Sequence, residues 1–214
     1  MKTSTIDNDY FAEFDRRQRG IEIHLVVAFL AGLAVGLAGM LGAGRIPGWL
    51  SQIHDPYAYL ALTVAVGATA SGFGWALLTT FLAVVATVVA VMGGGALRGS
   101  LDPALLGGTT AGLYWTVTLL VGVGLLAYVT RRSDRWGDLA AGAIGAVLVI
   151  DLAGRATQGF AGAHLWPLPA SFVVALAAVG VLLLRRTAPA RARTLAISAV
   201  AAGTFILGLT VLPA

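Results

Sequence analysis

Cysteine is absent from this chain of 214 residues, which excludes disulfide bonds, thiolate metal sites and cysteine nucleophiles. Charge is scarce as well: Asp, Glu, Lys and Arg together make up 11% of the sequence, while hydrophobic residues make up 58%. A water-soluble domain of this size needs a charged surface, and this composition does not supply one. The composition therefore predicts an all-α fold, a polytopic transmembrane helix bundle.

Seven apolar runs reach, or nearly reach, the roughly 20 residues that a helix needs to cross the ~30 Å hydrocarbon core. They cover residues 24–44, 57–70, 73–91, 109–130, 139–154, 168–184 and 195–212. The second and third runs form one apolar stretch, which we divide at Ser-Gly-Phe-Gly, residues 71–74, because two glycines permit a tight turn. The three glycines at 93–95 are interpreted as the end of the third span. We expect an arm over residues 1–22 and a seven-helix transmembrane domain over residues 23–214.

The cations fall mostly on one side of this seven-span arrangement. Eleven of the fourteen are Lys2, Arg16, Arg17, Arg19, Arg131, Arg132, Arg135, Arg185, Arg186, Arg191 and Arg193. The other side receives Arg45, Arg98 and Arg155. Because Lys and Arg collect in cytoplasmic loops, we expect a cytoplasmic N-terminus and an external C-terminus. The preponderance of Arg over Lys is typical of a high-GC genome, so the expected location is a bacterial cytoplasmic (inner) membrane.

The partners that these charges predict are lipids. The basic residues are spread over three loops and are partly offset by Asp and Glu, which favours contact with anionic lipid headgroups over binding of nucleic acid. In the arm, Tyr10, Phe11 and Phe14 alternate with charged residues. This pattern fits either a short amphipathic helix lying on the membrane surface or a polar tail with a few interfacial aromatics.

Small residues spaced four apart predict where helices pack closely within the membrane. They are Ala28, Gly32 and Gly36 in the first span, residues 140–146 in the fifth, and Ala199 and Gly203 in the seventh. We interpret these ridges as interfaces inside the bundle. The alternative is that they dock another copy of the chain or a different subunit.

Asp151 is the most informative polar residue within a span. It lies ~20 Å along the helix from Asp138, which marks the cytoplasmic end of the fifth span. A charge at such a depth costs at least ~2.5 kcal/mol and usually faces the bundle interior or a wet cavity. Arg155 follows four residues later on the same helical face. Asp151 is therefore either the ion-pair partner of Arg155 or a proton- or cation-coupled site.

Three further candidates fall on the predicted external side. Tyr114 and Trp115 begin the fourth span, and His164 lies in the third external loop. With Asp151 they could line a shallow pocket that opens to the outside. Aromatic residues at this level, such as Tyr57 and Tyr59, also fit an interfacial belt. His54, Asp55 and His164 are too scattered to predict a metal site, and no cofactor is expected.

The segment that runs from Tyr114-Trp115 through Arg-Arg-Ser-Asp-Arg-Trp-Gly, residues 131–137, to Asp151 resembles a family of small seven-span bacterial membrane proteins with no assigned function. An acidic residue, typically Glu, stands near the position of Asp151 in that family. The resemblance implies the topology, and no functional residue is carried over from it.

Three classes of function remain open at this point. The first is a small transporter in which Asp151 faces an external polar cavity. The second is a non-catalytic membrane subunit of a larger complex. The third is a membrane-embedded enzyme that acts on a lipid or an isoprenoid, which is disfavoured because catalysis needs a second acid, base or metal within reach.

Overall fold

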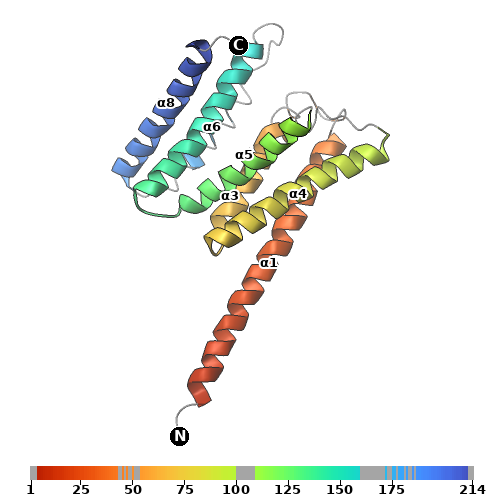
Figure 1. Cartoon of the computed structure of the whole chain (residues 1–214), viewed down its shortest axis with the longest axis vertical. Coiled ribbons are helices and arrows are strands. Elements are labelled where there is room, and N and C mark those ends of the chain that lie inside the picture. The colour runs from red at the N-terminus through yellow and green to blue at the C-terminus, as the bar shows by residue number, and fades with distance from the viewer. Residues whose placement is uncertain are drawn as a thin grey trace.

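The computed structural model of the chain describes residues 4–42, 45, 47, 50, 54–99, 109–159, 172, 175, 176, 178–180, 182, 185 and 187–211. Of residues 4–11, 153–159 and 209–211 it describes the backbone alone. The regular elements in these ranges are all helical, as predicted (Figure 1). They are α1 (Ser4–Gly42), the π-helical turn η1 (His54–Ala58), α3 (Tyr59–Thr69), α4 (Phe73–Leu97), α5 (Thr110–Val129), α6 (Arg135–Gly159) and α8 (Ala188–Val211).

Within the described residues, four helical segments are long and apolar enough to cross a membrane: Ala12–Gly42, Phe73–Leu97, Thr110–Val129 and Ala188–Gly208. They correspond to the first, third, fourth and seventh predicted spans. The second is the 11-residue helix α3, shorter than a bilayer requires. The fifth is the 25-residue helix α6, and most of the sixth lies outside the described residues. The count of seven and the orientation remain predictions.

The first helix is longer than the first predicted span. α1 has 39 residues and runs without interruption from the N-terminal arm into the apolar segment. Figure 1 shows its first half extending beyond the rest of the bundle. The arm is thus helical and coaxial with the span; whether it contacts the membrane surface remains a prediction.

The division between the second and third runs is confirmed, because α3 ends at Thr69 and α4 begins at Phe73. The predicted end of the third span at residues 93–95 is wrong. α4 passes through these glycines and ends at Leu97, and Gly99 follows in the left-handed region with φ of +68°. Gly94 is a packing residue, since a Cβ atom there would overlap the side chain of Met40 in α1.

The predicted small-residue ridge of the first span does pack inside the bundle. A Cβ atom at Gly32 would collide with the backbone of Ala83 in α4, and one at Gly36 would meet the carbonyl of Thr87 at 2.6 Å. The hydroxyl of Thr87 donates to the carbonyl oxygen of Gly32 at 3.1 Å. Close backbone approach therefore joins α1 to α4, as expected for helices that associate within lipid.

The ridge of the fifth span packs against α8, although the contact residues on α8 differ from those predicted. Ser198 donates a 2.9 Å hydrogen bond to the carbonyl oxygen of Gly142, and Thr194 is buried. Ala199 is exposed, and no atom of the described residues lies within 4 Å of a Cβ atom placed on Gly203. The prediction that these last two residues form an interface inside the bundle is wrong.

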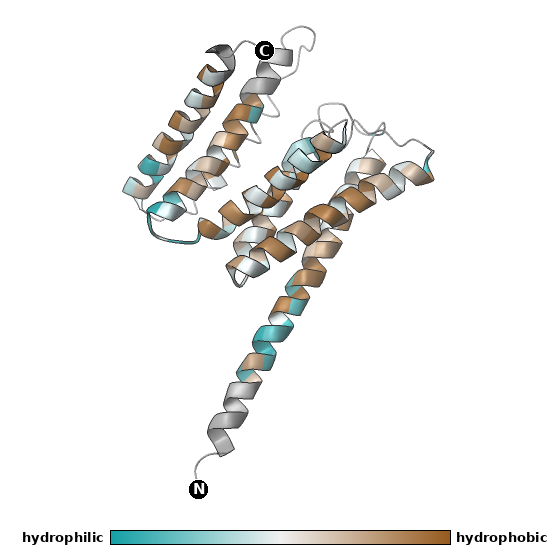
Figure 2. Cartoon of the chain, viewed as in Figure 1, coloured by the Kyte–Doolittle hydropathy of each residue, from teal (hydrophilic) through white to brown (hydrophobic). Residues whose placement is uncertain are grey.

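The hydrophobic core lies where four helices meet. It contains Tyr57 and Leu60 from η1 and α3, Val84 from α4, Leu120, Val123 and Ala127 from α5, and Ala141, Ile144 and Leu148 from α6. Hydrophobic residues predominate along most of the helices (Figure 2), and many of the large ones are exposed. Val200, Leu207 and Val26 are each more than half exposed. Such extensive exposed apolar surface fits contact with lipid rather than with water.

The polar residues of the described chain collect at two ends of this bundle. At one end His24 hydrogen-bonds Thr69 at 3.0 Å, and Arg131 donates to the carbonyl oxygen of Ala70. The turn between α5 and α6 and the start of α8 lie at the same end (Figure 1). At the other end Arg98 donates to the carbonyl oxygen of Met40 at 2.9 Å. We call the first the arginine end. The second adjoins η1, whose Tyr57 contacts Asp151, and we call it the Asp151 end.

Candidate functional site

Asp151 on α6 is the acceptor in a hydrogen bond between distant parts of the chain. The hydroxyl of Tyr57 in η1 donates to Asp151 Oδ2 at 2.8 Å. Tyr57 is 5% exposed and belongs to the core, whereas Asp151 is half-buried. The Asp151 carboxylate is therefore held by a buried donor, while part of the residue stays accessible.

The irregular backbone of η1 explains how Tyr57 reaches this position. Asp55 has extended φ and ψ of −106° and 113° inside the turn, and Pro56 follows it. Proline lacks the N–H that would continue a regular helix. The chain therefore changes direction before α3 begins, and Tyr57 points into the core rather than along the surface.

Two aromatic rings support η1 from the side of α1. His54 and Tyr59 meet edge to face with centroids 5.4 Å apart. A Cβ atom at Gly39 would stand 2.7 Å from Cε1 of His54 and 3.0 Å from the hydroxyl of Tyr59. The absent side chain at Gly39 thus makes room for the pair, which fixes η1 against the end of α1.

In the part of the chain that the structure describes, the other predicted site residues are not brought together with Asp151 in a pocket. The side chains of Tyr114 and Trp115 are 73% and 75% exposed, so neither is enclosed in a pocket. The side chain of Arg155 and the whole of His164 lie outside the described residues, and the Asp151–Arg155 ion pair remains a prediction.

Sequence reasoning assigned Tyr57 to an interfacial aromatic belt, whereas the structure buries it in the core. Tyr57 is 94 positions away from Asp151 in the chain, and no local spacing links the two. The available signal was the Asp55-Pro56 pair, which stands directly before the second apolar run and Tyr57.

A buried ion network occupies the arginine end. Asp138 of α6 is 1% exposed and lies 2.7 Å from Nε of Arg193 and 3.5 Å from Nε of Arg185. Arg185 is 4% exposed, and its Nη1 donates to the carbonyl oxygen of Arg132 at 2.7 Å. One carboxylate thus joins α6 to α8 and to the segment before α8.

Asp134 begins α6 in the same region. Its Oδ1 accepts from the backbone N–H of Gly137 at 3.1 Å, which is the arrangement of a helix N-cap. Its Oδ2 lies 2.8 Å from Nη2 of Arg132. Burial acts to raise the pKa of the Asp134 carboxyl, but the hydrogen bond from Gly137 and the Arg132 guanidinium outweigh it, so the pKa is lowered from its ordinary value.

Asp134 and Asp138 are four positions apart, a spacing at which two carboxylates on one helix face could share a metal ion. Both are engaged by arginine instead. Among the described residues, His, Cys, Asp and Glu form no group of three or more that could hold a metal. The pair therefore organises the start of α6.

Comparisons with known proteins add no further constraint on the site. No protein-family model matches the chain, and neither a curated protein nor a solved structure is significantly similar to it.

Proposed function

We propose that this protein is a small transporter of the bacterial inner membrane in which Asp151 binds the coupling proton or cation. The observation that carries the proposal is the hydrogen bond from Tyr57 to Asp151 at 2.8 Å. This bond holds a carboxylate of α6, the predicted fifth span, against the irregular turn η1. An intramembrane acidic residue that is expensive to keep, and is held by a specific donor, is typical of ion and proton pathways.

The short helix α3 and the irregular turn η1 support the same interpretation. Substrate and ion sites in many transporters are formed where a transmembrane helix is discontinuous, since unwound backbone there lines a cavity. The second predicted span, residues 57–70, is covered by the end of η1 and by α3, and the irregular residue Asp55 lies just before it, two positions from the Tyr57 that donates to Asp151. Asp151 would take up the proton or cation, and Tyr57 would orient its carboxylate.

The test is charge movement in proteoliposomes adsorbed on a solid-supported membrane. The purified chain is exposed in turn to monovalent cations, amino acids, sugars and organic acids, at two values of pH. We expect at least one class to produce a transient current that Asp151→Asn abolishes and Tyr57→Phe reduces severalfold. Tyr114→Phe is the matched control, because it removes an exposed tyrosine hydroxyl, and it should leave the current unchanged.

Two results contradict the proposal. A current that survives Asp151→Asn in a folded protein would remove Asp151 from the transport mechanism. No current with any solute class, from a preparation with intact helical circular dichroism and a single size-exclusion peak, would favour the non-catalytic subunit.

A further inference from the structure

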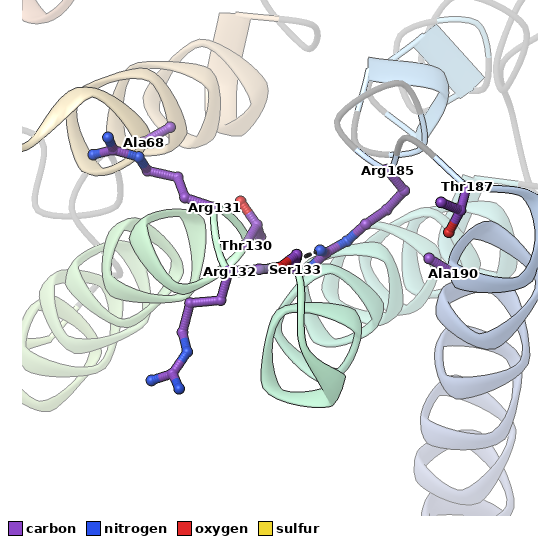
Figure 3. Close-up of a pocket in the computed structure, with 8 residues that line it drawn as sticks. All are labelled: Ala68, Thr130, Arg131, Arg132, Ser133, Arg185, Thr187 and Ala190. Carbon is purple, nitrogen blue, oxygen red and sulfur yellow. Dashed lines mark hydrogen bonds between the residues drawn. The ribbon is translucent and has the colours of Figure 1, made fainter.

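A cavity of about 500 Å³ lies at the arginine end, away from Asp151. It is lined by Ala68 of α3, by residues 130–133 in the turn after α5, and by Arg185, Thr187 and Ala190 around the start of α8. In Figure 3, Arg185 extends across it toward the turn after α5, and Arg131 reaches toward Ala68. Its size is that of a site for a small ligand or a lipid headgroup.

The charge around this cavity is positive. Arg131, Arg132 and Arg185 line it, and no acidic residue is among the described lining residues. Asp134 offsets Arg132, and the carboxylate of Asp138 is shared between Arg185 and Arg193. Arg131 donates to the carbonyl oxygen of Ala70, an acceptor that carries no charge. An anion in the cavity would therefore face uncompensated guanidinium charge.

Arg185 supplies the second observation. Its side chain is 5% exposed, and its Nη2 has no hydrogen-bond partner among the described residues. A buried donor without an acceptor is rare in folded proteins. This Nη2 lies against Gly137, where a Cβ atom would stand 2.5 Å from it, and Arg185 contributes its positive charge to the wall of the cavity. Ser133 and Thr187 add exposed hydroxyl groups, and the first turn of α8 contains no acidic residue to oppose an anion.

We propose that this cavity binds a phosphate group, with the headgroup of an anionic phospholipid as its source. A guanidinium group matches phosphate oxygens in both charge and geometry. Basic pockets between transmembrane helices at the cytoplasmic level are recognised sites for anionic headgroups. The proposal is independent of the transport function, because none of its residues contacts Asp151 or Tyr57 in the described structure.

The experiment is native mass spectrometry of the full chain titrated with phosphatidylglycerol, with zwitterionic phosphatidylcholine as the reference lipid. We expect one phosphatidylglycerol to bind in preference to phosphatidylcholine. Arg131→Gln should weaken that binding about tenfold, the effect of losing one charge-assisted hydrogen bond. Arg135→Gln is the matched control: it removes an equal charge four residues further along from a side chain that does not line the cavity, and should change binding less than twofold.

A second variant leaves the charge unchanged. Ala68→Leu fills the cavity and should reduce phosphatidylglycerol binding at least as much as Arg131→Gln does. Circular dichroism and size exclusion establish that each variant is folded. If Arg131→Gln does not fold, Ala68→Leu decides the question alone.

Inorganic phosphate distinguishes the two sources of the ligand. If millimolar phosphate binds with the same dependence on Arg131 and Ala68 and displaces the lipid, the site is a phosphate site for a free anion. If phosphate does not compete, the lipid headgroup is the ligand. Equal losses with Arg131→Gln and Arg135→Gln, or unchanged binding with Ala68→Leu, would overturn the proposal and leave diffuse surface charge as the explanation.

Discussion

Gly67 of α3 and Gly124 of α5 touch through their backbones, and a Cβ atom on Gly67 would overlap the carbonyl group of Gly124. The opposite side of Gly124 meets Thr80 of α4, whose Oγ1 would stand 2.7 Å from a Cβ atom there. Three helices thus converge on one glycine. This contact fixes the short helix α3, and with it Tyr57, relative to α5.

The first prediction concerns this convergence. Gly124→Ala should lower the free energy of unfolding by about 2 kcal/mol, because the methyl group overpacks a filled contact. Thr80→Ala, introduced in the same chain, should restore part of the loss by removing Cγ2 and Oγ1. Thr80→Ala alone should be nearly neutral, since its buried hydroxyl has no partner among the described residues. Thermal unfolding in detergent measures all three, and an additive double variant would place the strain elsewhere.

The contact between α1 and α4 gives the second prediction. Gly32→Leu and Gly36→Leu should each destabilise the bundle by about 3 kcal/mol, because a branched side chain cannot enter where the backbones nearly touch. Gly20→Leu is the control in the same helix, with nothing within 4 Å of its Cβ position. Equal melting temperatures for Gly32→Leu and Gly20→Leu would contradict this packing.

For the Tyr57–Asp151 hydrogen bond we expect a modest energy. Tyr57→Phe should lower stability by about 1 kcal/mol through loss of the hydroxyl donor. Asp151→Asn retains an oxygen acceptor and should cost less. A double-mutant cycle between Tyr57→Phe and Asp151→Ala measures the coupling directly, because Asp151→Ala removes the acceptor altogether. A coupling energy of zero would show that the bond does not form in the membrane-embedded protein.

Asp138 should matter more than either arginine beside it. Asp138→Asn leaves the buried Arg185 without its carboxylate, and we expect a loss of about 3 kcal/mol. Arg193 is half-exposed, so Arg193→Gln should cost about 1 kcal/mol while Arg185 keeps its partner. Chemical unfolding of the purified variants gives the ranking, and the reverse order would contradict the assignment of Arg185 as the buried partner.

The orientation is testable because the chain contains no cysteine. Leu97 is 91% exposed at the end of α4, and Ser133 is exposed in the turn after α5. With the predicted topology, Leu97→Cys should react with a membrane-impermeant thiol reagent in intact cells. Ser133→Cys should react only after permeabilisation. Labelling of Ser133→Cys from outside would reverse the orientation.

Sequence patterns predicted the features that depend on local spacing. The helical class follows from the length of the apolar runs, and the break between α3 and α4 follows from the position of the glycines. The ridge of Ala28, Gly32 and Gly36 follows from small residues at every fourth position. The extent of α4 was not predicted, because the low helix propensity of three glycines ends a helix only where tertiary packing does not stabilise it. Here Gly94 is needed for close approach to Met40, and tertiary packing keeps the helix intact.

The candidate site was predicted only in part, because Asp151 and its hydrogen-bond donor are far apart in the sequence. The sequence predicts that Asp151 lies within a membrane span. Its donor Tyr57, like the link from Asp138 to Arg193, depends on which helices are neighbours. The arginine-lined cavity has the same origin: its cations were interpreted as topology signals, and their convergence arises only when α3, α5 and α8 meet.

The glycine contacts between α1 and α4 also determine how the bundle responds to temperature. If these helices separate within a bilayer, the surfaces at Gly32 and Gly36 become exposed to lipid chains rather than to water. Little apolar hydration changes, and the heat-capacity increase that curves the stability of soluble proteins is correspondingly small. We therefore expect the attachment of α1 to α4 to vary almost linearly with temperature, without the loss on cooling that weakens a water-excluding core.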